Sequence, residues 1–259
     1  MNKRLSVVFF MLSTVLLSAQ NSLIRMPRIS PNAQEMAFSY QGDIWIHNFN
    51  TRQSKRLTIH EGYESNPVWN TTGDKLAFSS NRKGSNNIFT IKKTGGIPKQ
   101  LTYYPTSDIP YDWTSSNNII FATNRVLKGP EWDEQIYHVN ANGGTPKRFI
   151  TSLGSMASVY SDGNLVAFVK GACRISREDY SGSAQRDVWI YNIKKRNYFQ
   201  VTFSSKNDHS PSWDAAGNLY YIGAESGRYN IYKQSINTCL LYTSPSPRDR
   251  TRSRMPSSA

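Results

Sequence analysis

The sequence contains few of the residues that form disulfides, metal sites or nucleophilic centres. It has two cysteines, Cys173 and Cys239, and four histidines among 259 residues. Two cysteines are too few for a disulfide framework, and no Cys or His pair has the spacing of a zinc site. The fold must therefore be held by an apolar core, for which a composition of 38% hydrophobic and 12% aromatic residues is sufficient.

Helical periodicity and long apolar runs are also scarce. After the N-terminal segment, no long stretch has apolar residues spaced by three and four, which argues against a helical protein. The apolar run Leu5–Leu17 follows Lys3 and Arg4 and precedes Ser18-Ala19. This pattern predicts a secretory signal peptide over residues 1–19, cleaved after Ala19, because the run is short for a membrane span. An uncleaved anchor is the alternative. We expect a periplasmic or secreted protein with no membrane span after cleavage.

Acidic residues are fewer than basic ones, but the basic residues are not clustered. The formal net charge is +13, from 31 Lys and Arg against 18 Asp and Glu. Much of this excess lies near the two ends, and the remaining basic residues occur singly, mostly in turns. Nucleic-acid binding requires basic side chains gathered on one face, so the sequence predicts a solvated basic surface and no nucleic-acid partner.

The sequence is instead rich in short β-prone runs separated by Gly, Asn, Asp and Ser. The most regular stretch, residues 66–102, predicts four strands at residues 68–69, 75–79, 88–92 and 98–102. Landmarks of the second, third and fourth strands recur in the same order along the chain. Those of the second strand are Met36-Ala37-Phe38, Leu76-Ala77-Phe78, Ile119-Ile120-Phe121, Val166-Ala167-Phe168 and Leu219-Tyr220-Tyr221. Those of the third are Ile44-Trp45, Ile88-Phe89, Ile136-Tyr137, Val188-Trp189 and Ile231-Tyr232, and those of the fourth are Leu57-Thr58, Leu101-Thr102, Phe149-Ile150 and Val201-Thr202.

A four-stranded repeat of about 40–50 residues has the size of a β-propeller blade. One such sheet cannot bury both of its apolar faces, whereas radial stacking of blades buries each face against a neighbour. We therefore predict an all-β propeller, with a β-sandwich as the alternative. The predicted blades lie near residues 27–58, 66–102, 108–150, 155–202 and 208–238.

Residues 239–259 do not continue the repeat. The run Cys239–Asp249, CLLYTSPSPRD, resembles the in-frame translation of a DNA sequencing adapter. We therefore expect residues 20–238 to be a partial propeller domain and residues 239–259 to be a non-native tail on a truncated fragment. On this interpretation the fifth blade lacks its fourth strand.

Two repeats carry insertions between the second and third strands, at residues 125–134 and 171–186. Insertions at hairpin tips lie on one rim of a propeller, where binding surfaces often form. Ordinary loop variation is the alternative interpretation of each.

The residue types that carry catalysis or bind metals do not form a recognisable site. A nucleophile elbow requires Gly-x-Ser-x-Gly, which is absent, so Ser155 and Ser183 are predicted to be loop residues. His60 and Glu61 with Glu64 lack the second His of a zincin helix. The remaining histidines, His47, His138 and His209, are dispersed.

Acidic residues likewise have structural interpretations. Glu131, Asp133 and Glu134 lack the alternation and glycine turn of a calcium loop, which favours a solvated loop. Asp208-His209-Ser210 has the composition of a catalytic triad, but triads are assembled from distant segments. Three turn residues, Asp74, Asp162 and Asp214, are predicted to cap hairpins. The sequence therefore predicts no catalytic residue, no cofactor and no metal ligand.

The repeats resemble those of TolB-type propellers. The resemblance is clearest from Asn70 to Thr102, through LAFSSNR, Asn-Ile-Phe and GGIPKQLT, and covers Arg28 to Thr238. Such repeats are shared by TolB-type translocation proteins, the propeller caps of prolyl-oligopeptidase-type proteases and tricorn-type proteases. Two details are similar to tricorn-type proteases. The first blade begins at once, at Pro27, and the insert from Tyr180 to Ile190 resembles a Gly-rich loop that enters an Ile-Trp-Ile strand.

The resemblance to tricorn-type proteases implies a six-bladed propeller followed by a second propeller, a PDZ domain and a serine peptidase core. No catalytic residue of that core can be assigned to this chain. The propeller is expected to act as a substrate gate or channel, or as an interaction scaffold, for peptides or unfolded protein, and the intact protein could form oligomers. The alternative is a non-enzymatic TolB-like propeller that binds partner proteins.

Overall fold

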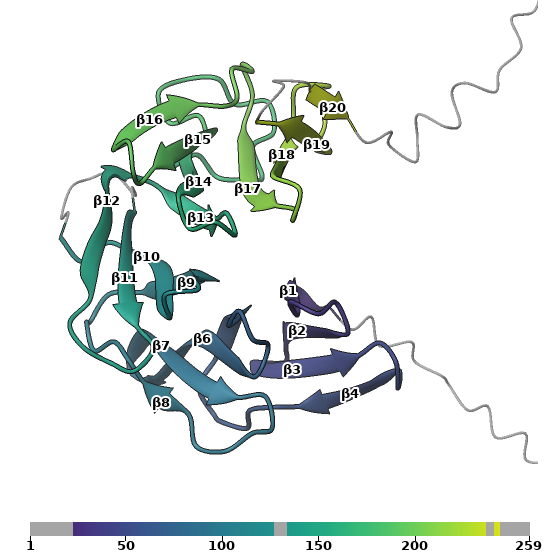
Figure 1. Ribbon diagram of the computed structural model, residues 1–259, viewed down its shortest axis with the longest axis vertical. Helices are drawn as coiled ribbons and strands as arrows, with labels where there is room; N and C mark the ends of the chain where they lie inside the picture. The colour runs from purple at the N-terminus through teal and green to yellow at the C-terminus, as the bar shows by residue number, and fades with distance from the viewer. Residues whose placement is uncertain (1–22, 127–133, 237–240, 244–259) are drawn as a thin grey trace, which may run out of the picture.

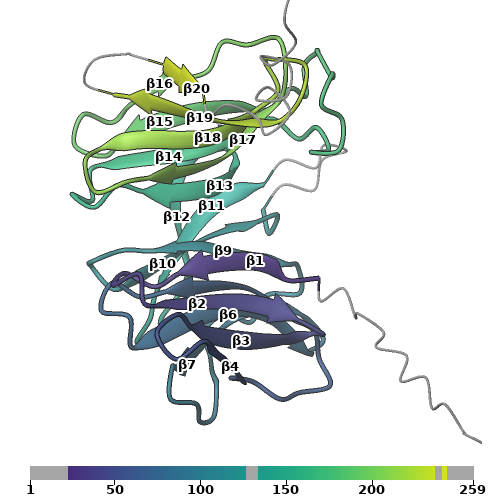
Figure 2. The same ribbon diagram turned by 90° about the vertical axis from the view of Figure 1, so that its right-hand side faces the viewer.

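The computed structural model describes residues 23–126, 134–236 and 241–243 of the chain. In these ranges it contains strands and no helix, and the strands form five four-stranded antiparallel sheets. Within each sheet, the four strands are neighbours in their order along the chain. Figure 1 shows the sheets as blades arranged around an open arc, and Figure 2 shows the same blades stacked as layers. The predicted all-β propeller is confirmed.

The strand bounds are as follows. Blade one contains β1 (Arg25–Ile29), β2 (Glu35–Tyr40), β3 (Asp43–Asn48) and β4 (Gln53–Arg56), and blade two contains β5 (Glu64–Trp69), β6 (Lys75–Lys83), β7 (Ser85–Lys92) and β8 (Lys99–Gln100). Blade three contains β9 (Asp108–Trp113), β10 (Asn118–Thr123), β11 (Gln135–Asn140) and β12 (Lys147–Leu153). Blade four contains β13 (Ser155–Val159), β14 (Leu165–Lys170), β15 (Asp187–Asn192) and β16 (Asn197–Gln200), and blade five contains β17 (Asp208–Trp213), β18 (Asn218–Gly223), β19 (Asn230–Ser235) and β20 (Leu241–Thr243).

The strands of blade two differ in length from the prediction. Strand β5 begins at Glu64, before the apolar pair Val68-Trp69, because its polar residues pair with the end of β6 across a bulge. Strand β8 is limited to Lys99–Gln100. After it, the pairing with β7 continues through one hydrogen bond, from the N–H of Leu101 to the carbonyl of Ile88. Polar residues that extend a ladder at a hairpin end carry no apolar signal, so the sequence pattern missed them.

The fifth blade also has a fourth strand, which the sequence analysis did not predict. Strand β20, Leu241–Thr243, pairs antiparallel with β19 at Tyr232, Lys233 and Gln234. The prediction that the fifth blade stops after its third strand is therefore wrong. Three β-prone residues are enough to pair with an otherwise open strand edge, even without the Leu-Thr landmark.

The packing between blades explains the repeated landmarks. Along each second strand, alternate side chains face opposite neighbours: Leu76 and Phe78 pack against blade one, and Ala77 packs towards blade three. In the third strand, Ile88 faces the following blade and Phe89 the preceding one. Each fully buried aromatic or aliphatic side chain of this kind contributes about 1.5–3 kcal/mol. The landmarks are thus the contacts that stack one blade on the next.

The arc is open between blade one and blade five (Figure 1). Every residue of β1 is exposed, including Met26 and Ile29. On the opposite face, Ile231 is 54% exposed, although its counterparts Ile44, Ile88, Ile136 and Val188 are fully buried. Ile231 is thus exposed at a position that the other four blades bury, and the face of β1 leaves Met26 and Ile29 uncovered.

Candidate functional site

The first strands of the blades face the centre of the arc. β1, β5, β9, β13 and β17 contact one another in this order, and Figure 1 shows β1, β9, β13 and β17 around the centre. Each of these inner strands is interrupted by a bulge or register shift. A bulge bends and twists a strand and redirects its side chains. Four of the shifts contain a residue with positive φ, namely Met26, Asn66, Met156 and Ser210.

Proline follows three of these four residues. Pro27, Pro67 and Pro211 each occupy the position after the positive-φ residue. Proline cannot donate a ladder hydrogen bond, so a bulge is one of the few strand positions that tolerates it. A proline in the first strand, together with the residue before it, is therefore the local sequence signal for the bulge.

The inner strands and the turns after them enclose an axial groove of about 640 Å³. All five blades contribute to its lining. Aromatic side chains from blades two to five line the wall together with Ser and Thr residues, and Tyr160 and Trp213 pack with ring centroids 5.2 Å apart. The aromatic lining residues are Trp69, Tyr111, Trp113, Tyr160 and Trp213, and the charged ones are Arg28, Asp112 and Asp214.

Hydrogen bonds between neighbouring inner strands hold the groove wall. Trp69 Nε1 donates to the carbonyl of Arg28 at 3.0 Å, and Trp213 Nε1 donates to the carbonyl of Ser158 at 3.1 Å. The N–H of Val159 donates to Asp112 Oδ2 at 2.6 Å. These bonds join blade one to blade two, blade three to blade four and blade four to blade five.

The groove carries charges of both signs: Arg28 is basic, and hydrogen bonding by the Asn218 side chain lowers the pKa of Asp214. Burial raises the pKa of Asp112, although the N–H groups of Val159 and Trp113 and the charge of Arg28 act in the opposite direction. Burial and the nearby Glu134 raise the pKa of Tyr111, which stays a neutral phenol. The groove can therefore offer aromatic faces and hydrogen-bonding groups to a guest, without a strong field of one sign.

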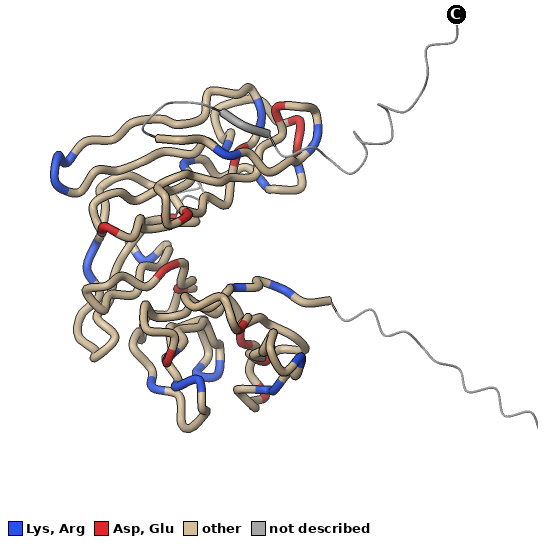
Figure 3. The backbone as a smooth tube through the Cα atoms, turned by 45° about the vertical axis from the view of Figure 1, so that its right-hand side comes forward, with Lys and Arg blue, Asp and Glu red and all other residues tan. Residues whose placement is uncertain are grey.

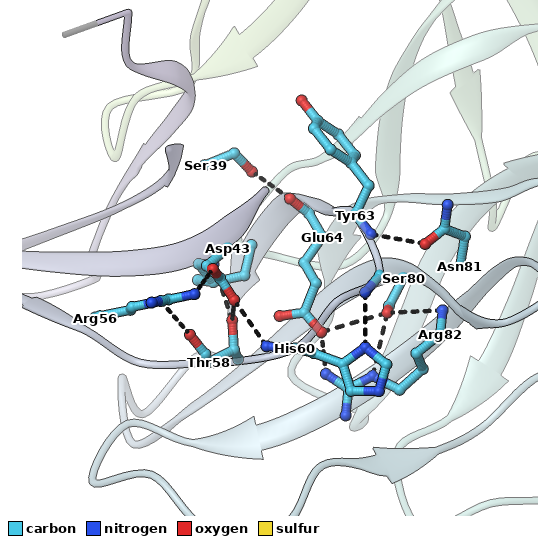
Figure 4. Close-up of polar contacts among 12 residues, drawn as sticks. Ser39, Asp43, Arg56, Thr58, His60, Tyr63, Glu64, Ser80, Asn81 and Arg82 are labelled. Carbon is cyan, nitrogen blue, oxygen red and sulfur yellow. Dashed lines mark hydrogen bonds and ion pairs between the residues drawn. The ribbon is translucent and has the colours of Figure 1, made fainter. Parts of the chain in front are cut away.

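At the other end of the inner strands, ion pairs join strands within a blade. Arg82 pairs with Glu64 in blade two, and Arg125 pairs with Asp108 in blade three. Figure 4 shows the first of these pairs beside the Asp43–Arg56 pair of blade one. Glu64 and Asp108 are fully buried. Such pairs order the structure, because removal of one partner leaves an uncompensated buried charge.

A buried threonine recurs beside these pairs. Thr58, Thr102 and Thr202 each accept a hydrogen bond from a third-strand N–H, at 2.9 Å in all three cases. In blade three Ile150 takes this place, and both side-chain polar atoms of the buried Gln135 have no partner in the described part of the chain.

The structure places the predicted serine and histidine positions apart. Ser155 is buried at the start of β13 and not in a loop, whereas Ser183 lies in an exposed loop as predicted. His47 Nδ1 lies 2.9 Å from Ser54 Oγ, and His60 Nδ1 accepts from the N–H of Gly62 at 2.8 Å. His138 packs against Phe149, and burial lowers the pKa of its imidazole.

The Asp208-His209-Ser210 tripeptide does not form a relay. Asp208 Oδ2 accepts from Ser204 Oγ at 2.9 Å, and His209 Nδ1 lies 2.9 Å from Ser210 Oγ. Burial lowers the pKa of His209 to about 4, and Arg186 adds to this effect. The structure thus directs Asp208 to a different partner from its two neighbours.

The acidic candidates are similarly dispersed. Glu64, next to His60-Glu61 in sequence, turns into blade two and pairs with Arg82. Glu131 and Asp133 lie outside the described residues. Burial raises the pKa of Glu134, partly offset by Arg186. In the described ranges, no group of three or more His, Cys, Asp or Glu is placed to hold a metal ion.

The predicted turn caps are confirmed. Asp162 Oδ1 accepts from the N–H of Asn164 at 2.7 Å, and Asp214 Oδ1 accepts from the N–H groups of Ala216 and Asn218. Asp74 accepts from the Thr72 hydroxyl and the Asn70 amide, contacts that lower the pKa of its carboxyl.

The insert at residues 171–186 packs on the linker between blades four and five. Asn207 Nδ2 donates to the carbonyl of Arg177 at 2.6 Å, and Gln185 Nε2 donates to the carbonyl of Ser204 at 2.7 Å. Lys206 pairs with Asp179 at 2.8 Å. The other insert is described only at its two ends. Basic residues are spread over the blades without a continuous stripe (Figure 3).

Comparisons with known proteins agree with this architecture. Residues 21–242 match the family described as the tricorn protease N-terminal β-propeller domain. The chain belongs to this family. A tricorn protease homolog from Saccharolobus solfataricus is 20% identical over 209 residues, which are 78% of this chain and 19% of the homolog. An uncharacterized peptidase of Bacillus subtilis, YuxL, is 30% identical over 103 residues, or 38% of this chain and 15% of YuxL.

Solved structures show the same fold. The crystal structure of the tricorn protease superposes with a TM-score of 0.74 and 16% identity, over 87% of this chain and 22% of that one. A TolB from Acinetobacter baumannii gives 0.70 and 21%, over 87% and 55%. A putative TolB from Agrobacterium tumefaciens gives 0.70 and 14%, over 86% and 80%. This tricorn-type propeller chain spans less than a fifth of its curated relatives. In its described residues, no helix is long and apolar enough to cross a membrane.

Proposed function

We propose that this chain is the substrate-handling propeller of an exported tricorn-like serine peptidase. The axial groove would receive extended peptide or unfolded protein and guide it to a peptidase core elsewhere in the intact protein. The propeller itself would contribute no catalytic residue. Export would follow from cleavage of the predicted signal peptide after Ala19.

The observation that carries this proposal is the axial groove within a tricorn-type N-terminal propeller. All five blades line the groove, and the family match covers residues 21–242. Aromatic rings without a strong field of one sign suit an extended chain of varied sequence, because apolar and stacking contacts do not depend on a particular residue.

A cross-linking experiment tests the groove. A photoreactive residue would replace Ser212, which is exposed in the groove, or Ser183, which is exposed in the 171–186 insert. With reduced, carboxymethylated α-lactalbumin as a permanently unfolded probe, we expect cross-links from position 212 and few from position 183. Equal labelling from both positions, or preferential labelling of a folded protein, would contradict guidance by the groove.

The division of labour has its own test in the intact protein. Ser212→Trp, which narrows the groove, should lower kcat/KM for long unfolded substrates and leave hydrolysis of short peptides unchanged; Ser183→Trp is the matched control. Peptidase activity in residues 20–238 alone would refute the assignment of catalysis to another part of the protein.

A non-enzymatic, TolB-like binding propeller is the second candidate. It is favoured by the two TolB structures, one of which this chain matches over 80% of its length. The uninterrupted gene sequence separates the two functions. Further propeller, PDZ and peptidase segments after Thr238 support the peptidase, and a stop codon soon after the propeller supports the binding protein.

A further inference from the structure

Blade three and blade five have matching geometry at a constant offset of one hundred residues. Asp108 pairs with Thr123 across β9 and β10, and Asp208 pairs with Gly223 across β17 and β18. The inner strands Asp108–Trp113 and Asp208–Trp213 have the same length and end in the same residue. Residues 101–125 can therefore be compared one by one with residues 201–225.

In blade three this region holds a guanidinium group. Arg125 Nη2 donates to both carboxylate oxygens of Asp108 at 2.8 Å. The guanidinium carbon lies 5.1 Å from the ring centroids of Tyr104 and Tyr137 and 5.2 Å from that of Phe121. A buried carboxylate and aromatic faces together form the slot, and both favour a planar cation.

Blade two repeats the arrangement. Arg82 pairs with the buried Glu64, and its guanidinium carbon lies 4.9 Å from the ring centroid of Phe89 and 5.8 Å from that of Phe78. The slot is thus a feature of the repeat, filled in each case by an arginine of the blade's own second strand or the turn after it.

Blade five keeps the buried carboxylate and two of the three aromatic rings of the slot and lacks the cation. Asp208 is 1% exposed, and the rings of Tyr221 and Tyr232 are stacked with centroids 5.5 Å apart. The residue that corresponds to Arg125 is Glu225, and Ser204 replaces Tyr104. In the part of the chain that the structure describes, neither Asp208 nor Glu225 forms a salt bridge.

The slot of blade five opens into a cavity of about 460 Å³. Asp208, Tyr221 and Glu225 line it, together with Phe199 and Phe203 from the strand and linker of blade four. Phe203 is 78% exposed, so an apolar surface borders the entrance. In blade three, by contrast, the Arg125 guanidinium lies at the corresponding position beside Asp108.

We propose that this cavity binds the arginine side chain of an extended polypeptide. The guanidinium would replace the missing Arg, pair with Asp208 and Glu225, and contact the ring of Tyr221, which lines the cavity. Arginine fits better than lysine because its planar fork can bond carboxylates and stack on rings at the same time. The flanking Phe199 and Phe203 favour a peptide over free arginine, since residues next to the arginine can bury apolar surface there. The site is independent of the axial groove, which lies beyond the opposite end of β17, and of any peptidase core.

Binding of blocked arginine to the complete chain tests the proposal. The probes are N-acetyl-arginine amide, its lysine and citrulline analogues, and a peptide with apolar residues around one arginine. We expect a dissociation constant on the order of 1 mM for the blocked arginine and tighter binding of the peptide. Citrulline, which has the same shape without charge, should bind at least about tenfold more weakly.

Two variants locate the site. Glu225→Arg restores the arrangement of blade three, so it should abolish arginine binding and raise the thermal unfolding midpoint, which shows that the variant is folded. Glu61→Gln removes one exposed negative charge elsewhere and should leave binding unchanged. Failure of the wild-type chain to bind the arginine probes, equal binding of citrulline, or undiminished binding by Glu225→Arg would each overturn the proposal.

Discussion

An individual ion pair contributes strongly to the stability of the fold where its carboxylate is fully buried. Asp108 is 0% exposed, and Arg125 supplies its charged partner together with contacts to three aromatic rings. Arg125→Ala should therefore lower the free energy of unfolding by about 3–5 kcal/mol, because it leaves a buried charge unpaired. Urea denaturation measures this loss. The control is Lys195→Ala in the exposed turn after β15, for which a loss above about 0.5 kcal/mol is not expected. Equal losses in the two variants would contradict the role of the pair.

The raised pKa of Asp208 predicts that the free energy of unfolding depends on pH, with a definite sign. Burial, with Asp187 and Glu225 as added negative charges, raises its pKa to about 6 from an ordinary value of 3.8. The folded state therefore holds a proton that the unfolded state releases at lower pH, so this group destabilises the fold as pH rises from about 4 to 6. The penalty above pH 6 is up to about 3 kcal/mol.

The Asp208→Asn variant isolates this effect. His209 acts in the opposite direction. Its pKa is lowered to about 4, so its buried neutral ring lowers the free energy of unfolding as pH falls below the pKa that the histidine has in the unfolded chain. The variant retains His209, so the difference in unfolding free energy between variant and wild type should grow in favour of the variant from pH 4 to pH 6.5. A difference that does not change with pH would contradict the raised pKa.

At the scale of the strand, the buried threonines connect the end of one strand to the start of another. Thr102 Oγ1 accepts from the N–H of Ile88 at 2.9 Å and donates to Asn87 Oδ1 at 3.3 Å. Thr102→Val should lower the unfolding free energy by about 1–3 kcal/mol, because it leaves a buried N–H without a partner. Thr71→Val, at an exposed turn, is the control for the change of side-chain type. Similar stabilities for both variants would show that the threonine bond is not needed.

The blade is the unit at which sequence and structure agree best. In blades two to four, the Ile-aromatic or Val-aromatic pair of the third strand was a reliable landmark because its two side chains serve two different blade interfaces. The strand limits were less predictable. The polar ends of β5 and β6 are set by pairing across a bulge, for which hydrophobic periodicity carries no information.

At the scale of the whole molecule, the open arc exposes two apolar faces. Ile29 is 53% and Ile231 is 54% exposed on the faces of blades one and five. We expect the 259-residue chain to self-associate, because exposed apolar surface and unpaired edges promote aggregation. Light scattering should show a lower mean mass for the double variant Ile29→Lys, Ile231→Lys. A chain that is monomeric and unfolds cooperatively without these changes would contradict the expectation.

The sequence by itself determined the repeat, the four-stranded blade and the stacking of blades, because these depend on contacts between landmarks that recur at regular spacing. The sequence also contains Arg125 in blade three and Glu225 at the equivalent position of blade five, but it does not show what this difference does to the structure. Only the tertiary structure places Arg125 over three rings beside Asp108, and only the equivalent pairing of β17 and β18 leaves Asp208 and Glu225 around an open cavity. The axial groove was likewise beyond the sequence, since its wall combines bulged ends of five strands that lie far apart in the chain and meet only when the blades are stacked.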